Sequence, residues 1–195
     1  MSTDKREAKR GEFQQLAREH LPRLYGLARR LVGEGAEDLV QETLLRAYRS
    51  FDTLKDPEAS RRWLQSILVN VFRDGLRKRE RRVTEVSVED VESFSLYRQI
   101  ADDDPFPYSD SLHLDFLRAF GTEDVHEVLT RLPDIYRAPL VLRYVEGFAT
   151  KEIARMLGAP LGTILARLHR GRKLFEKTLW TYAEENELLI AEGAR

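Results

Sequence analysis

The sequence contains no cysteine, and its 195 residues include no long hydrophobic run. Without cysteine the chain has no disulfide, no thiolate nucleophile and no cysteine-ligated zinc site. No apolar stretch approaches the roughly 18 residues that a membrane-spanning helix needs. The first ten residues are largely charged and hold no apolar signal region. We therefore expect a soluble, cytoplasmic protein with no membrane insertion.

Residues for covalent chemistry are also scarce. The sequence has no Gly-rich phosphate loop and no Ser/His/Asp set, and its four histidines are not spaced as metal ligands: His20, His113, His126 and His169. We expect no cofactor and no metal, and we expect that the protein is not an enzyme. A hydrolase or similar enzyme is the weakest alternative, because no nucleophile–base pair supports it.

Charge is plentiful and is arranged in blocks, although the whole chain carries a net charge of only −1. Residues 61–82 contain eight Lys/Arg and two acidic residues, a net +6. Residues 83–115 contain nine acidic residues and one Arg, a net −8. Residues 150–177 contain seven Lys/Arg and two acidic residues, a net +5. Two basic blocks on either side of an acidic one indicate two contacts with a polyanion.

Apolar residues recur at helical spacing through most of the chain, which predicts an all-α fold. The expected helices are 13–32, 36–51, 61–82, 115–120, 123–132 and 134–146, followed by the segment 150–173. Residues 83–112 lack this periodicity and mix acids, Ser and Pro, as a linker does. We predict two small helical domains, 11–82 and 115–180, joined by a flexible acidic linker, 83–114. No role is assigned to the tail 181–195.

Residues 150–173 predict a helix-turn-helix in the C-terminal domain. Gly158-Ala159-Pro160 separates two helices, because Gly can end a helix and Pro suits the start of the next. In the second helix an apolar stripe is expected to face inward: Leu161, Ile164, Leu168 and Phe175. The side chains expected to face outward are Leu165, Ala166, His169, Arg170 and Lys173, with Arg167 and Arg172 on the flanks. Such a helix fits the major groove of DNA, and an ordinary helical hairpin with a solvated basic face is the alternative.

Two helices of the N-terminal domain have unusual outward faces. Helix 36–51 is expected to present Asp38, Gln41, Glu42, Leu45 and Arg49, which hints at a protein partner, although most such faces are simply solvated. Helix 61–82 carries Asn70, Arg73, Asp74, Arg77 and Lys78 on one side. Amides and carboxylates can bond to base edges, and cations neutralise phosphates. Trp63 and Phe72 can stack on unpaired bases, although the spacing of Trp63 favours the core.

In combination these segments resemble a bacterial extracytoplasmic-function (ECF) sigma factor. The resemblance is carried by residues 38–48 (DLVQETLLRAY), Arg62-Trp63-Leu64 with Ile67 and Asn70, Arg131-Leu132-Pro133, and the helix-turn-helix, in the order of the family. It covers roughly residues 11–82 and 120–176, which correspond to the family's regions 2 and 4. It implies a promoter-specificity subunit that binds RNA polymerase core and helps to melt the −10 region. A free-standing helix-turn-helix regulator that acts without the polymerase is the alternative.

The resemblance also implies roles for single residues. The β′ clamp helices of the polymerase are expected to contact Asp38, Gln41, Glu42 and Leu45. The loop 53–60 and the helix after it are expected to capture flipped −10 bases, with Arg61, Asn70, Arg73, Asp74, Arg77 and Lys78 at the DNA. The −35 element is expected to meet Thr163, Leu165, Ala166, Arg167, His169, Arg170 and Lys173.

The partners implied are RNA polymerase core, through its β′ clamp helices and β flap, promoter DNA and an anti-sigma factor. The acidic linker is expected to run along the polymerase's active-site cleft and RNA exit channel. One departure from the family concerns Leu165 and Ala166, where relatives often carry polar residues. These side chains can contact thymine methyl groups but cannot donate hydrogen bonds.

Overall fold

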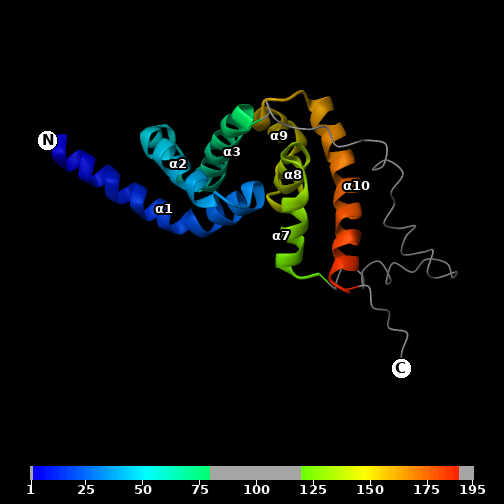
Figure 1. Ribbon diagram of the computed structural model, residues 1–195. Helices are drawn as coiled ribbons and strands as arrows, with labels where there is room; N and C mark the ends of the chain where they lie inside the picture. Colours follow the sequence, from blue (N-terminus) through cyan, green and yellow to red (C-terminus); the bar gives the residue numbers. More distant parts are fainter. Residues whose placement is uncertain (1, 80–119, 189–195) are drawn as a thin grey trace. The chain divides into compact units, whose positions relative to one another are not determined.

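The computed structural model describes residues 2–79 and 120–188 (Figure 1). Every regular element in these two ranges is helical, so the all-α prediction is confirmed. The elements are α1 (Ser2–Val32), α2 (Ala36–Arg49), the 3-10 turns η1 (Phe51–Thr53) and η2 (Pro57–Ala59), α3 (Ser60–Arg79), α7 (Thr122–Arg131), α8 (Asp134–Leu140), the π-helical turn η4 (Val141–Val145), α9 (Thr150–Leu157) and α10 (Leu161–Glu185). The predicted linker 83–114 and helix 115–120 lie outside the described residues, except for Phe120.

The described residues form two compact units. The first contains α1, α2, η1, η2 and α3 together with residues 151–159, and the second contains α7, α8, η4 and α10. No helix within the described ranges is long and apolar enough to cross a membrane. The predicted boundaries of the two domains, the linker and the C-terminal tail stay predictions.

In the first unit α1 packs against α2 and α3, and α2 packs against α3. The turn between α1 and α2 depends on glycine, because Gly35 has a φ of 83°, a conformation that costs other residues free energy. Glu37 and Asp38 lie in the first turn of α2, where negative charge is favoured. The core is built mainly from aliphatic side chains, with two phenylalanines: Phe13, Leu24, Leu27, Ala28, Leu31, Val40, Ala47, Leu64, Leu68, Val69 and Phe72.

In the second unit α10 packs against α7 and α8. Gly171 allows the close approach to α8, since a Cβ there would lie 3.2 Å from the Leu140 Cδ1 atom. Two polar contacts tie α10 to α7. Arg131 pairs with Glu185 at 2.6 Å, and the Tyr182 hydroxyl donates to Asp124 at 2.6 Å. The core is apolar: Val128, Leu129, Leu132, Leu140, Val141, Leu142, Ile164, Leu168 and Leu179.

The structure differs from the sequence prediction in several places. Phe72 was predicted to be able to stack on a base, but it is only 4% exposed because it continues the buried stripe of Leu64 and Leu68. Leu161 was predicted to face inward and is 38% exposed. The predicted loop 53–60 contains the whole 3-10 turn η2, which the Asp56 side chain caps by accepting the Glu58 N–H at 2.9 Å. Helix α10 continues to Glu185 and so includes the start of the predicted tail.

Candidate nucleic-acid interface

Most of the residues predicted to face DNA in the first unit lie along α3. Arg61 is exposed at its first turn, and Asn70, Arg73 and Asp74 are half-buried further along. Arg77 and Lys78 belong to the last turns of α3, but their side chains lie outside the described part of the structure. The helix therefore brings an amide, a carboxylate and cations onto one element, which is the mixture that base edges and phosphates require.

A charged network fixes Asp74. The Arg46 guanidinium on α2 donates to the Asp74 carboxylate at 2.7 Å and to the Glu42 carboxylate at 2.7 Å. The Asp74 oxygens are also 3.7 Å from Arg73. The hydrogen bond to Asp74 and then that to Glu42 raise the pKa of Arg46 above its usual range. Arg46 was missed as a site residue, although its spacing of four from Glu42 is typical of a helical ion pair.

The outward face of α2 has the predicted composition. Asp38 and Gln41 are exposed, and Leu45 is 55% exposed, which is unusual for a leucine on a helix whose opposite side is buried. Glu42 is half-buried because it is paired with Arg46. The apolar spacing of Val40, Leu44 and Tyr48 predicts that Tyr48 faces inward, but it is exposed, with its ring 5.2 Å from that of Phe13. This face therefore combines acids, an amide and exposed apolar groups.

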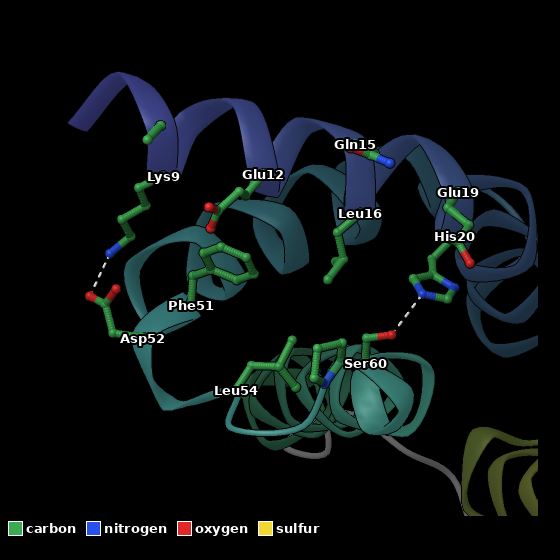
Figure 2. A pocket seen from close by; sticks show the side chains of 12 residues that line it. Lys9, Glu12, Gln15, Leu16, Glu19, His20, Phe51, Asp52, Leu54 and Ser60 are labelled. Carbon is green, nitrogen blue, oxygen red and sulfur yellow. Dashed lines mark hydrogen bonds and ion pairs between the residues drawn. The ribbon is translucent and has the colours of Figure 1, made fainter. Parts of the chain in front are cut away.

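A cavity of about 670 Å³ lies beside the loop 53–60 (Figure 2). Helix α1 forms one side of it, and η1, η2 and the start of α3 form the other. The His20 ring and the Ser60 hydroxyl share a hydrogen bond across it at 2.9 Å, and Lys9 pairs with Asp52 at 2.5 Å. Its other walls mix apolar and polar side chains: Leu16, Leu54, Pro57, Phe51, Glu12, Gln15 and Glu19. Sequence reasoning missed the α1 side, because a histidine on an amphipathic helix carries no distinctive signal.

In the predicted helix-turn-helix, α9 ends at Gly158, whose φ is 63°, and α10 begins after Pro160. Four of the residues predicted to face outward on α10 are exposed: Leu165, Ala166, His169 and Arg170. Lys173, also predicted to face outward, is instead half-buried, as are Thr163 and Arg167. The first turn of α10 contains no acidic residue. The described surface of this helix is therefore apolar at its start and basic one turn later.

An apolar groove of about 340 Å³ lies in the second unit between α7, α8, η4 and α10. Its lining is almost entirely apolar, with Arg172 and Glu176 as the charged exceptions: Val125, Leu129, Leu140, Val141, Tyr144, Val145, Phe175 and Leu179. Val125, Tyr144 and Val145 are exposed large side chains. Within the described residues no cluster of His, Asp and Glu could hold a metal ion.

These features define a class of protein: an all-helical chain with a helix that exposes polar or basic side chains in each unit, and with exposed apolar faces elsewhere in the described residues. The family described as Sigma-70 region 2 matches residues 16–82, and the family described as Sigma-70, region 4 matches residues 122–175. The chain belongs to the ECF RNA polymerase sigma factors. As a member of this family it directs promoter-specific initiation by RNA polymerase, and the free-standing regulator is not favoured.

Several relatives support this assignment. The ECF RNA polymerase sigma factor SigW of Bacillus subtilis is 31% identical over 160 residues, covering 80% of this chain and 83% of the relative. SigE of Mycolicibacterium smegmatis is 36% identical over 89% of this chain, which spans 63% of that relative's length. The solved sigma factor RpoE from Bartonella quintana, in complex with the anti-sigma factor NepR, is 25% identical with a TM-score of 0.56. That match covers 87% of this chain and 97% of the RpoE chain.

Proposed function

We propose that this chain binds RNA polymerase core and reads a promoter at two points, the −10 element through α3 and the −35 element through α10. The observation that carries this proposal is the pair of reading faces, one on each compact unit. The polar and basic face of α3 suits unpaired bases and their phosphates, and the exposed start of α10 suits a major groove. The proposal needs no catalytic residue, so the chain acts as a transcription factor and not as an enzyme, in the cytoplasm with the polymerase.

At the −10 element, the loop 53–60 and α3 capture bases that leave the duplex. Asn70 bonds to a base edge, and Arg61, Arg73, Arg77 and Lys78 stabilise the phosphates. The cavity beside the loop supports this proposal, because its apolar walls and its His20–Ser60 pair offer a flipped base both a stacking surface and hydrogen-bonding groups. Asp74 is held by Arg46 and therefore presents a fixed carboxylate.

Two surfaces are available for the polymerase. The exposed face of α2, with Asp38, Gln41 and Leu45, is proposed to bind the β′ clamp helices, and Glu42 contributes beside Arg46. The apolar groove of the second unit is proposed to receive the β flap, since its lining is apolar and its rim is exposed. An anti-sigma factor is a third proposed partner, supported by the solved relative that is bound to NepR.

The decisive experiment is run-off transcription with purified core polymerase and a promoter library. We expect a defined −10 and −35 pair to be selected only when both the chain and core polymerase are present. Tight binding of the chain alone to a duplex site, without any need for core, would instead support the free-standing regulator.

The variant Asn70→Ala tests the −10 assignment within the same system. We expect open-complex formation, measured by permanganate reactivity of unpaired thymines, to fall by about five- to 150-fold, as expected for one lost base contact of about 1–3 kcal/mol. Binding to core polymerase should be unchanged. Equal losses of core binding and promoter opening would contradict the base-reading role of Asn70.

A further inference from the structure

The start of α10 has an exposed apolar side. Leu161 is 38% exposed and Leu165 is 53% exposed, and their spacing of four residues places them on the same side of the helix. Ala166 is exposed next to Leu165. Between them Gly162 has no protein atom within 4 Å of the position that a Cβ would take. Packing inside the protein therefore explains neither the exposed leucines nor the missing side chain at residue 162.

Hydrogen-bonding side chains are scarce in the same stretch. Among residues 161–166 only Thr163 has a hydroxyl, and it is half-buried. The N-terminal residues of a recognition helix are those that contact base edges in the major groove. In that groove the four base pairs offer hydrogen-bond donors and acceptors and a single apolar group, the 5-methyl group of thymine. The first turns of α10 can therefore recognise the methyl group far better than any other feature of a base edge.

The charges along α10 favour a duplex as the partner of this apolar side. Arg167, Arg170 and Lys173 come within the next two turns, and the first turn carries no acidic residue that would repel phosphates. Cations at these positions can hold the helix against the two phosphate strands that border the groove. An apolar protein partner would not require this basic flank.

We propose that Leu161, Leu165 and Ala166 read thymine in the −35 element by contact with its 5-methyl group, and that Gly162 lets the helix backbone approach the bases closely. This inference rests on the proposed function, in which α10 enters the major groove of the −35 element. It assigns the sequence preference at the start of α10 to apolar contact. Arg170 and His169 supply the hydrogen bonds further along the helix.

The test replaces single thymines by uracil, which removes only the methyl group. The selected promoter, bound to holoenzyme made from the full chain and core polymerase, is substituted one −35 thymine at a time. We expect a three- to tenfold loss of affinity at one or two positions. In the Leu165→Ala holoenzyme, the same uracil substitution should change affinity by less than twofold, because the methyl group has already lost its contact.

Controls separate this inference from its alternatives. Leu161→Ala provides a second variant at the same surface, and Leu21→Ala removes a leucine of similar exposure on α1, outside the proposed interfaces. The Leu21→Ala holoenzyme should keep the full effect of uracil. Uracil effects below twofold at every −35 thymine, or effects that persist in both α10 variants, would overturn methyl reading. Failure to select any promoter with core polymerase present would instead overturn the proposed function itself.

Discussion

The two helices that are proposed to read DNA expose different kinds of side chain. On α3 a polar residue, Asp74, is held in place by Arg46 from a neighbouring helix. At the start of α10 the exposed residues are leucines, an alanine and a glycine. A hydrogen bond to a base depends on the direction of the side chain, so it benefits from such a brace. Contact with a methyl group does not depend on direction in this way, so it needs only a side chain of the right shape and no brace. On the proposed function, one chain would read two DNA elements by two kinds of chemistry.

The largest effect is expected from Arg170→Ala, which removes the polar part of the α10 readout. If Arg170 makes a bidentate contact with a guanine, affinity for the −35 element should fall by about 1–3 kcal/mol. The measurement is a competition assay with promoters altered at each −35 position in turn. A promoter altered at the position that Arg170 contacts should bind the wild-type and Arg170→Ala chains equally well. A promoter preference identical to that of the wild-type chain would remove Arg170 from the base-reading set.

The next effect concerns the brace on α3. Arg46→Ala breaks two partly exposed ion pairs, so the free energy of unfolding should fall by about 0.5–1 kcal/mol in a urea titration. Arg49→Ala, a cation at the end of the same helix, controls for the loss of charge and should have little effect.

Promoter opening then distinguishes two roles of Asp74. If Asp74 contacts a base, Asp74→Ala should impair opening more than Arg46→Ala does. If Asp74 only binds Arg46, the two variants should impair opening equally, and the contrast between α3 and α10 would weaken.

Smaller effects are expected from Gly162→Ala, which should leave stability unchanged or raise it but lower the affinity for DNA. The added methyl group meets no protein atom, and alanine is the better helix former, so stability should stay the same or rise by up to about 0.5 kcal/mol. Affinity for the −35 element should nevertheless fall severalfold if the backbone approaches the bases there. Gly171→Ala is the matched control, because its Cβ would crowd Leu140 and lower the melting temperature. A Gly162→Ala variant with normal −35 affinity would argue against a close approach.

The smallest effect is a pH dependence of the second unit. The hydroxyl of Tyr182, and next the backbone N–H of Gly121, lower the pKa of Asp124 below its ordinary value of 3.8. A carboxylate with a lowered folded-state pKa stabilises the fold above its unfolded pKa, and this contribution is lost as the pH falls through the folded value. The melting temperature of the wild-type chain should therefore exceed that of Asp124→Asn at about pH 6. The gap should close toward about pH 3. A gap independent of pH would show that the charge of Asp124 is unimportant.

The sequence was sufficient to predict the helical fold, because apolar residues recur at helical spacing over long segments such as α1 and α10. This spacing does not fit a β-strand. It also indicated the outward faces of α2 and α10, since the apolar spacing of each helix leaves Leu45 and Leu165 outside the buried stripe. The family comparisons then confirmed the sigma-factor assignment that rested on these segments.

The errors have local physical causes. Leu161 was assigned to the core from its spacing, but it is the first residue of α10 and has no preceding turn to cover it. Phe72 was considered able to stack on a base, but it continues the stripe of Leu64 and Leu68 that α3 buries against its neighbours. The Arg46–Asp74 bond and the His20–Ser60 pair join residues 28 and 40 positions apart. Contacts at that distance depend on how helices pack, which spacing along one helix does not reveal.

The rim of the apolar groove depends on how many residues the π-helical turn η4 contains. It comes directly after α8, which contains Pro139, and its wide turn is closed by the Glu146 N–H, which donates to the Val141 carbonyl at 3.1 Å. Tyr144 and Val145, at the groove's rim, fall within this turn. A turn of this type holds one residue more than an α-helical turn. Deleting a single residue there would restore an ordinary α-helical turn and remove one side chain from this stretch of the groove wall. The number of residues in η4 therefore decides which side chains reach the rim.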